Sequence, residues 1–248
     1  MNVIKPTLIF LHGLLGSKND WQKLLQNLPH FRCVALDLPL HGRAQDISVA
    51  DFAHASEYLH EQIKSAVQNQ PFFLVGYSLG GRLALHYVLK YQPENLQGLI
   101  LEGANFGLQS ETECAARWQN DEKWAQRFES EPMENVLEDW YQQPVFAHLD
   151  KQQRQHLIAL RRQNRGDKIA QMLRATSLAK QPNFRPHLAD LACPLYYLCG
   201  EKDQKFRQMA QQTGIEPILI AHAGHNAHQE NPAEFAHQLA QIVCNSTR

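Results

Sequence analysis

The stretch "FFLVGYSLGGRLALHYV", Phe72 to Val88, places Ser78 between two glycines at the end of an apolar run. The run has no polar alternation, as expected of a strand buried on both faces, and the residues after Ser78 follow helical spacing. The serine therefore lies on a strand-to-helix turn. Gly76 and Gly80 lack the Cβ atoms that would clash if this turn were tight enough to project the hydroxyl outward. We interpret the motif as a Gly-x-Ser-x-Gly nucleophile elbow, with an ordinary tight turn as the alternative.

The composition of the chain indicates a globular protein with one sizeable core. The 248 residues are 44% hydrophobic, a length and composition that fit one large α/β domain or a domain with an insertion. With 24 basic and 25 acidic residues the net charge is -1, so a nucleic-acid partner is a poor expectation. The N-terminal sequence "MNVIKPTLIFLHG" has no long apolar segment and no cleavage site, which favours a cytoplasmic protein without a membrane anchor.

The cysteines are odd in number and include no CxxC pair, which favours reduced thiols over a disulfide framework. They are Cys33, Cys114, Cys193, Cys199 and Cys244.

Apolar, β-rich runs alternate with helical patterns along most of the chain. This alternation predicts an α/β fold with a mostly parallel central sheet flanked by helices. From Gln109 to about Pro186 the pattern changes to helical spacing rich in Gln, Arg, Glu and Trp, without a convincing strand. We therefore expect an α/β core formed by residues 1–108 and 187–248, and a helical cap, residues 109–186, inserted after the strand ending near Glu102. The predicted strands are Thr7 to Leu11, Cys33 to Leu36, Phe72 to Val75, Leu99 to Leu101, Leu195 to Cys199 and Ile218 to Ile220.

A serine hydroxyl at such an elbow needs a histidine to take its proton, and the histidine needs a carboxylate to fix its tautomer. The stretch "YYLCGEKDQKF" ends a predicted strand with a loop that carries Asp203. The stretch "ILIAHAGHNAHQENP" ends the next one with a loop that carries His225. The order Ser78, Asp203, His225 is that of the α/β-hydrolases, so these three residues are the predicted catalytic triad.

Other residues could fill the roles of acid and base. Glu102 also follows a strand end, although Gly103 and Ala104 lead on into the cap, and Glu201 shares the loop of Asp203 but reads as a solvated carboxylate. His222 and His228 flank His225 and read as surface or supporting residues. The spacing "HNAH" is one residue short of His-x-x-x-His, so we expect no metal site.

The motif "FLHGLLGS" follows the first predicted strand. His12 and Gly13 let this loop pass close to the elbow, so the backbone N–H groups of Leu14 and Leu79 can converge on one developing oxyanion. An ordinary glycine turn is the alternative. The stretch "DLPLHGRA", Asp37 to Ala44, reads as structural, although many α/β-hydrolases have Gly where this chain has Leu40.

Several stretches together resemble one family of α/β-hydrolase-fold lyases, the 2-succinyl-6-hydroxy-2,4-cyclohexadiene-1-carboxylate synthases of the menaquinone pathway. The resemblance runs through nearly the whole chain, and the cap stretches are the parts most specific to this family. The stretches are "VGYSLGGR", "LEGANFGLQ", "EDWYQQPVFA", "ALRRQN", "MLRATSLAKQP", "YYLCGEKDQKFR" and "AGHNAHQENPAEF".

The resemblance implies a carbon-oxygen lyase that removes pyruvate from an enolpyruvyl cyclohexene with three carboxylates. This reaction needs a base and no hydrolytic water. By resemblance, the Ser78 alkoxide would abstract the proton alpha to the succinyl ketone, and the N–H groups of Leu14 and Leu79 would hold the enolate oxygen. No cofactor is implied, and the expected partner is a small tricarboxylate bound by a monomer or small homo-oligomer.

Arg82 lies four residues after Ser78, so a helix returns it to the same face, where its guanidinium can hold a carboxylate bidentately. Arg117 and Arg161 match the family motif in the cap, and by resemblance Tyr77, Trp140 and Tyr141 line the substrate site. Two other readings stay open: a serine hydrolase of an ester, thioester or carbon-carbon bond, and a binding protein on a hydrolase fold. Acylation of Ser78 would distinguish the hydrolase, and loss of a triad member is typical of the binding protein.

Overall fold

The computed structural model describes residues 6–246, in which six parallel strands form one central sheet. The sheet order is β2-β1-β3-β4-β5-β6, and each strand begins within a few residues of the position predicted from the sequence. The predicted parallel sheet is therefore confirmed. The strands are β1 (Thr7–Leu11), β2 (Arg32–Leu36), β3 (Phe72–Tyr77), β4 (Leu96–Glu102), β5 (Leu195–Gly200) and β6 (Ile218–Ile220).

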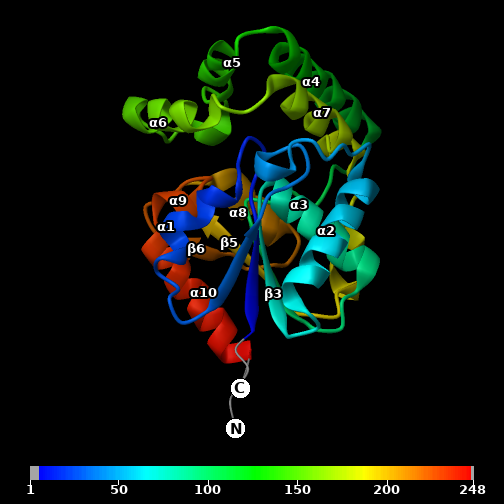
Figure 1. Ribbon diagram of the computed structural model, residues 1–248, viewed down its shortest axis with the longest axis vertical. Helices are drawn as coiled ribbons and strands as arrows, with labels where there is room; N and C mark the ends of the chain where they lie inside the picture. The colour runs from blue at the N-terminus through cyan, green and yellow to red at the C-terminus, as the bar shows by residue number, and fades with distance from the viewer. Residues whose placement is uncertain (1–5, 247–248) are drawn as a thin grey trace.

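Helices cover both faces of the sheet (Figure 1). Alternate residues of a strand point to opposite faces, so Ile9 and Leu74 pack with α2, α3 and α8, while Phe10 and Val75 pack with α1 and α10. The core helices are α1 (Gln22–Leu25), α2 (Phe52–Val67), α3 (Leu79–Tyr91), α8 (Gln204–Gln212), α9 (Ala227–Glu230) and α10 (Pro232–Ser246), with 3-10 helices η1 (Lys18–Trp21), η2 (Gly42–Ala44) and η5 (Arg185–Asp190).

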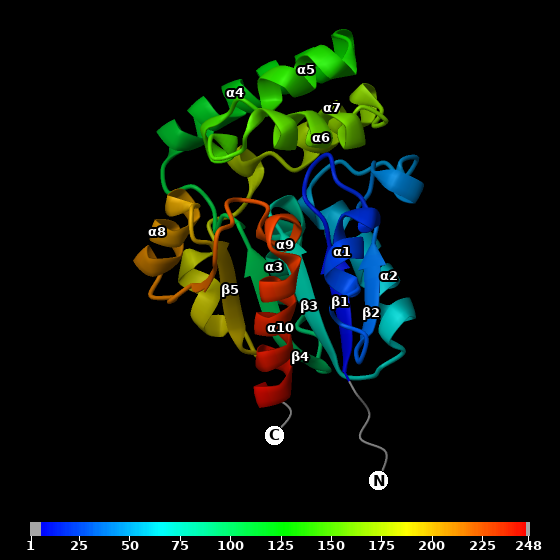
Figure 2. The ribbon, with the colours of Figure 1, turned by 90° about the vertical axis from the view of Figure 1, so that its left-hand side faces the viewer.

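A second layer of helices lies over the edge of the sheet that is formed by the carboxyl ends of the strands (Figure 2). Two of these helices begin with a capping box, at Ser110 and at Asp150, which satisfies the first free N–H groups of each helix. The helices are α4 (Glu111–Ser130), α5 (Met133–Trp140), η3 (Pro144–Phe146), α6 (Lys151–Arg161), α7 (Gly166–Ala175) and η4 (Leu178–Lys180).

We call these helices the cap. They fall within the predicted range 109–186, in which the structure describes no strand. The division into core and cap stays a prediction, and its core ranges include residues 1–5 and 247–248, which lie outside the described residues.

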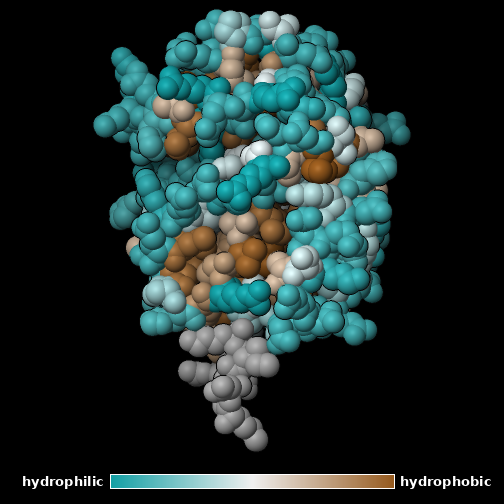
Figure 3. Space-filling model, in the orientation of Figure 1, coloured by the Kyte–Doolittle hydropathy of each residue, from teal (hydrophilic) through white to brown (hydrophobic). Residues whose placement is uncertain are grey.

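The cap has a small apolar core of its own, centred on Phe128, Leu137 and Ile169. Its outer surface is mostly hydrophilic in the view of Figure 3. The Gln- and Arg-rich stretch of α6 is largely exposed, as the sequence predicts. The cap therefore encloses the carboxyl end of the sheet, where ligands bind in open α/β sheets.

Candidate active site

Ser78 occupies the turn between β3 and α3 in a backbone conformation that other residues rarely adopt. Its φ is 49° and its ψ is -109°, a combination that costs on the order of 1 to 3 kcal/mol and persists only where the surroundings impose it. Two backbone hydrogen bonds do so, because Ser78 N–H donates to Glu102 O at 2.8 Å and Arg82 N–H donates to Ser78 O at 3.0 Å. The predicted elbow is thus present as a strained turn.

The glycines around Ser78 allow the neighbouring loop to approach closely. A Cβ on Gly80 would lie 2.4 Å from the carbonyl oxygen of His12, and a Cβ on Gly76 would lie 2.6 Å from Gly81 Cα. A side chain at Gly80 would push the end of β1 and the loop after it away from the elbow, and a side chain at Gly76 would push β3 away from the first turn of α3. This contact brings residues 12–14 beside Ser78, where a Cβ on Gly13 would lie 3.5 Å from Ser78 Cβ.

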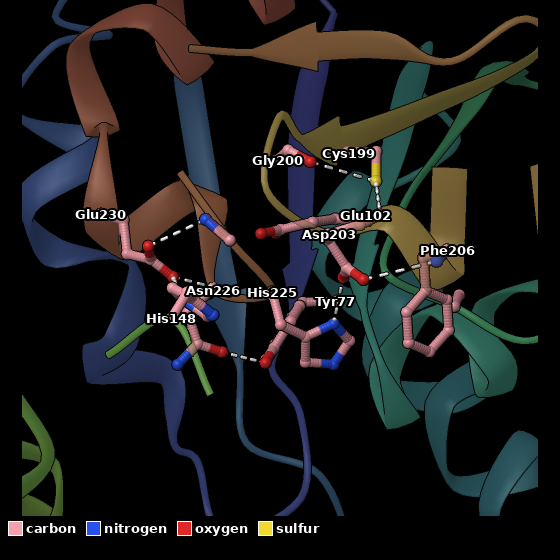
Figure 4. Close-up of polar contacts among 12 residues, drawn as sticks. Tyr77, Glu102, His148, Cys199, Gly200, Asp203, Phe206, His225, Asn226 and Glu230 are labelled. Atoms are coloured by element: carbon pink, nitrogen blue, oxygen red, sulfur yellow. Dashed lines mark hydrogen bonds and ion pairs between the residues drawn. The ribbon is translucent and has the colours of Figure 1, made fainter. Parts of the chain in front are cut away.

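His225 and Asp203 form the acid–base pair predicted from the sequence (Figure 4). His225 Nδ1 lies 2.7 Å from Asp203 Oδ2, and both side chains are buried. Asp203 also caps α8, where its Oδ1 accepts the N–H of Phe206, and the ring of Phe206 stacks on His225 at 4.8 Å. The Asp203 carboxylate accepts a hydrogen bond from Nδ1–H, so Nε2 is the basic nitrogen of His225.

His225 lies next to the end of β4, whose last residue, Glu102, accepts the Ser78 N–H. A Cβ on Gly103 would lie 2.7 Å from His225 Cε1, and Gly103 follows Glu102, whose carbonyl binds Ser78 N–H. Gly103 has a φ of 55°, which is another reason for glycine at this position. Within residues 6–246 no hydrogen bond joins Ser78 Oγ to His225, so a side chain has to move before the third link of the triad forms.

Glu102 binds His228. Its two carboxylate oxygens lie 2.7 and 3.0 Å from His228 Nδ1, and both residues are almost completely buried. The prediction that His228 is a surface residue is therefore wrong, because its side chain is buried. The alternative, that it is a supporting residue, fits its pairing with Glu102. Glu201 and His222 are exposed and bond to each other through the His222 N–H, as expected of a surface loop.

Two candidate oxyanion donors lie at the elbow, one from the start of α3 and one from the loop after β1. Leu79 is the first residue of α3, so its N–H has no carbonyl partner within the helix. The N–H of Leu15 donates to His41 Nε2 and that of Gly16 to Gly13 O, whereas the N–H of Leu14 has no acceptor among the described residues. Both predicted N–H groups are therefore available to a ligand.

Two buried histidines hold this loop. Leu38 N–H donates to His12 Nε2, which leaves the proton on Nδ1, 2.8 Å from Gly13 O. His41 has the same arrangement, because Nε2 accepts from Leu15 and Nδ1 lies 2.8 Å from Pro39 O. Burial lowers the pKa of His12, and burial together with the adjacent His12 lowers the pKa of His41 to about 3. Both rings are neutral at pH 7 and act as fixed hydrogen-bond bridges.

Arg82 lies one turn behind Ser78 and is held by neutral acceptors. Its Nη1 donates to Thr176 O at 2.9 Å and to Gln181 Oε1 at 3.3 Å, and among the described residues no carboxylate pairs with it. Burial and the nearby Arg117 guanidinium lower the pKa of Arg82 to about 9. The edge formed by Nε and Nη2 has no protein acceptor in the described chain, and this is the edge that a carboxylate binds bidentately.

The two cap arginines already have carboxylate partners. Arg117 Nε donates to Asp121 at 2.7 Å within α4, which leaves its Nη groups free. Arg161 donates through both Nη atoms to Asp20 at 2.6 and 2.7 Å, and its buried Nε has no partner in the described chain. Burial alone would raise the pKa of the Asp20 carboxyl, but the Arg161 guanidinium outweighs it and lowers that pKa. The three predicted arginines therefore differ in how much of each guanidinium is free.

The predicted aromatic residues divide between the site and the cap interior. The Tyr77 ring lies 5.3 Å from His225, and its hydroxyl donates to Asn226. Burial raises the pKa of Tyr77 well above its ordinary value, so the hydroxyl stays protonated. Tyr141 is buried, and burial raises the pKa of its hydroxyl although the nearby Arg161 guanidinium acts to lower it. Trp140 packs against the apolar core of the cap, 5.0 Å from Trp124.

Sequence reasoning missed several residues at this site. Phe146 of the cap lies edge-on to His225 at 6.0 Å, and Asp20 and Asn164 contact the loop after β1 from two sides. The family-like stretch "DWYQQPVF" contains Phe146 and was the available signal for it. Asp20 had none, because its partner is 141 residues away.

A cavity of about 530 Å³ lies between α6, the η1–α1 segment and α9. Its lining includes Arg161, Asp20 and Asn226 but no triad residue, so it adjoins the predicted site rather than containing it. Within residues 6–246 there is no cluster of three or more potential metal ligands, and no described helix is long and apolar enough to cross a membrane.

The site combines a strained serine elbow with a hydrogen-bonded Asp–His pair and free backbone N–H groups, at the carboxyl end of a parallel sheet. This arrangement defines the α/β-hydrolase class of enzymes. The model of the alpha/beta hydrolase fold family matches residues 6–232. A solved structure described as MenH from S. aureus superposes with a TM-score of 0.91, at 26% identity, over 100% of this chain and 97% of that chain.

Curated relatives narrow the class further. The chain is 47% identical to the 2-succinyl-6-hydroxy-2,4-cyclohexadiene-1-carboxylate synthase of Citrobacter koseri, over 96% of this chain and 94% of the relative. It is 54% identical to a Haemophilus influenzae protein given that name provisionally, over 97% of this chain and 98% of the relative. The chain belongs to the 2-succinyl-6-hydroxy-2,4-cyclohexadiene-1-carboxylate synthase family, and the predicted resemblance is confirmed.

Proposed function

We propose that this protein eliminates pyruvate from 2-succinyl-5-enolpyruvyl-6-hydroxy-3-cyclohexene-1-carboxylate to give 2-succinyl-6-hydroxy-2,4-cyclohexadiene-1-carboxylate. It is a carbon-oxygen lyase of menaquinone biosynthesis, built on an α/β-hydrolase scaffold. The observation that carries the assignment is the free edge of Arg82, a partly buried guanidinium one helical turn from Ser78 that has no carboxylate of the protein as its partner. A hydrolase of neutral esters has no use for such a cation.

The chemistry follows from the Asp203–His225 pair and the elbow. His225 Nε2 takes the hydroxyl proton of Ser78, and the resulting alkoxide takes the proton alpha to the succinyl ketone. The electron pair moves onto the ketone oxygen, where the N–H groups of Leu14 and Leu79 stabilise the enolate. When the enolate collapses, a ring double bond forms and the bond to the enolpyruvyl oxygen breaks. The departing enolpyruvate takes a proton from His225 and becomes pyruvate, so no water is consumed.

The three arginines would bind the substrate carboxylates with different numbers of free N–H donors. Arg82 offers its Nε and Nη2 edge, and Arg117 offers its Nη groups beside it. Arg161 can contribute its unpaired Nε, or its Nη groups if a substrate carboxylate displaces Asp20. We therefore expect Arg82 to be the strongest carboxylate ligand of the three. Tyr77 packs against His225 from the core, and Phe146 lies edge-on to His225 from the cap. We expect Tyr141, which is buried near Arg161, to line the same substrate site.

We place the enzyme in the cytoplasm as a monomer or small homo-oligomer that needs no cofactor. A small, charged tricarboxylate is a substrate for an aqueous compartment, and every group that the mechanism requires is a side chain or backbone N–H of this chain.

The test supplies the purified protein with the enolpyruvyl substrate and follows release of pyruvate. Mass spectrometry of the protein during turnover should show unmodified Ser78, because a serine that acts as a base is never acylated. Pyruvate release above the uncatalysed rate, lost in Ser78→Ala, supports the proposal. A stable acyl adduct on Ser78 with this substrate, or no pyruvate release, would instead point to the serine hydrolase.

A further inference from the structure

Leu15, one residue beyond the candidate oxyanion donor Leu14, has a left-handed backbone conformation with a φ of 66°. A leucine rarely adopts this conformation, and it persists only where surrounding contacts impose it. The residue lies in the loop after β1, directly beside the elbow. The contacts that impose the conformation therefore also determine the position of the Leu14 N–H.

Those contacts come from both the core and the cap. On the core side, Leu15 N–H donates to His41 Nε2 at 3.2 Å. On the cap side, Leu15 O accepts from Asn164 Nδ2 at 2.9 Å, and the same amide nitrogen donates to Arg161 O at 2.9 Å. Asn164 is the third residue after α6, so one side-chain amide joins the end of that helix to the strained residue.

The side chain of Leu15 makes the same connection through packing. It is 1% exposed and belongs to the apolar core of the cap, together with Phe128 and Leu137. A loop of the core domain thus inserts a leucine into the cap. The bidentate pair between Arg161 and Asp20 ties the end of α6 to the segment that follows this loop.

Hydrogen bonds hold the peptide group that contains the Leu14 N–H and also the two peptide groups that follow it. Gly13 O, in the same peptide group, is held by His12 Nδ1 and by Gly16 N–H. Because carbonyl and N–H point in opposite directions across a trans peptide, holding Gly13 O directs the Leu14 N–H away from the interior of the loop. The next peptide is held by His41, and the one after it by Asn164 of the cap.

We propose that Asn164 is a positioning residue for the oxyanion hole: through Leu15 it makes the direction of the Leu14 N–H depend on docking of the cap. The inference rests on the proposed function, in which the Leu14 N–H stabilises an enolate. A cap that lifts from the core loses the bond to Leu15 O and the packing of the leucine side chain together, and the strained loop relaxes. The donor is then in place only when the cap is docked on the core.

The test uses Asn164→Asp, which keeps the size of the side chain but cannot donate to Leu15 O when ionised, and Asn164→Ala. Asn120→Ala, an exposed asparagine of α4 in the same cap, is the matched control. We expect both Asn164 variants to lower kcat about tenfold to a hundredfold with KM within about threefold of wild type, because an oxyanion donor acts mainly on the transition state. The control should keep both constants.

Hydrogen exchange supplies a readout that needs no substrate. The backbone of residues 12–16 should exchange faster in both Asn164 variants than in wild type and in Asn120→Ala. If Asn164→Asp fails to fold, Asn164→Ala carries the test, since it only shortens a partly exposed side chain. Unchanged kcat, a rise in KM alone, or unchanged exchange of residues 12–16 would overturn the inference. Absence of pyruvate release by wild type would instead refute the proposed function and leave the exchange result to decide the positioning role.

Discussion

Replacing Arg82 by alanine tests the arrangement on which the assignment of substrate depends. The guanidinium uses only Nη1 for the protein, in bonds to Thr176 O and Gln181 Oε1, and keeps the Nε–Nη2 edge free. The change therefore removes one bidentate binding edge for a carboxylate. It also removes a cation that burial disfavours, since burial lowers the pKa of Arg82 to about 9.

The expected loss follows from the number of bonds. A bidentate edge makes two charge-assisted hydrogen bonds, each contributing about 1.5 to 3 kcal/mol, and water in the space left by the side chain recovers part of the sum. We expect a loss of about 2 to 4 kcal/mol in transition-state stabilisation, the range observed when a buried charge pair loses one partner. This corresponds to about thirtyfold to a thousandfold in kcat/KM. Stability should change by no more than about 1 kcal/mol, because loss of the bonds to Thr176 and Gln181 is offset by release from burying an unpaired charge.

The assay is pyruvate release at several substrate concentrations, with thermal unfolding of each variant as a check on the fold. Arg82→Lys should recover only part of the loss, because an ammonium keeps the charge but not the planar pair of donors. Arg127→Ala is the matched control, since Arg127 pairs with Glu131 and Asp139 on the cap surface. If Arg82→Ala kept kcat/KM within threefold of wild type, Arg82 would be a structural residue of α3, and the tricarboxylate assignment would lose its main support.

Three further predictions concern the triad and the buried histidines. Ser78→Ala and His225→Ala should each lower kcat by at least about a thousandfold without unfolding the chain, since both act in one proton-transfer unit; loss of tenfold or less in the pyruvate assay would remove that residue from the mechanism. Asp203→Asn should be similarly severe, whereas Glu102→Gln should leave kcat within about tenfold and instead lower the free energy of unfolding, because Glu102 binds a histidine outside the triad. The reverse ordering would make Glu102 the catalytic acid. Burial lowers the pKa of His41 from 6.5 to about 3, so its unfolded form binds a proton first as the pH falls. The contribution of His41 to the free energy of unfolding is therefore complete above pH 6.5. As the pH falls from 6.5 toward 3, this contribution decreases by about 1.4 kcal/mol per pH unit. Urea unfolding between pH 4 and 6 should therefore show a shallower pH dependence in His41→Gln than in wild type, and equal slopes would contradict this account.

Features that depend on residues close together in the chain were predictable from the sequence. The apolar run before Ser78 and the helical spacing after it specify a strand, a turn and a helix, because each is decided by periodicity and glycine placement over a few residues. Arg82 could be placed near Ser78 for the same reason, since four residues make about one helical turn. The parallel sheet followed from repetition of such runs, and the cap from a long segment without them.

Chain order favours Asp203 over Glu102 as the catalytic acid, and the geometry supports this prediction by pairing each carboxylate with a different histidine. Both carboxylates follow strand ends, and each faces a different histidine in the folded chain. Nothing in the sequence around Glu102 indicates that its carboxylate pairs with His228, which is 126 residues away. Only the packing of the His225 loop against β4 and β5 separates the two pairs.

Chain order and local spacing thus determined which residues line the carboxyl end of the sheet, while tertiary structure decided which of their atoms are free to act. Arg161 fits the family motif as well as Arg82 does, yet Asp20, 141 residues away, occupies both of its Nη groups. Leu15 and Asn164 are 149 residues apart, and neither sequence pattern indicates the bond between them. Hydrogen bonds and ion pairs of this kind depend on distances of about 3 Å between side chains from different elements. Local periodicity does not determine such distances, because they are set only when the cap and the core pack together.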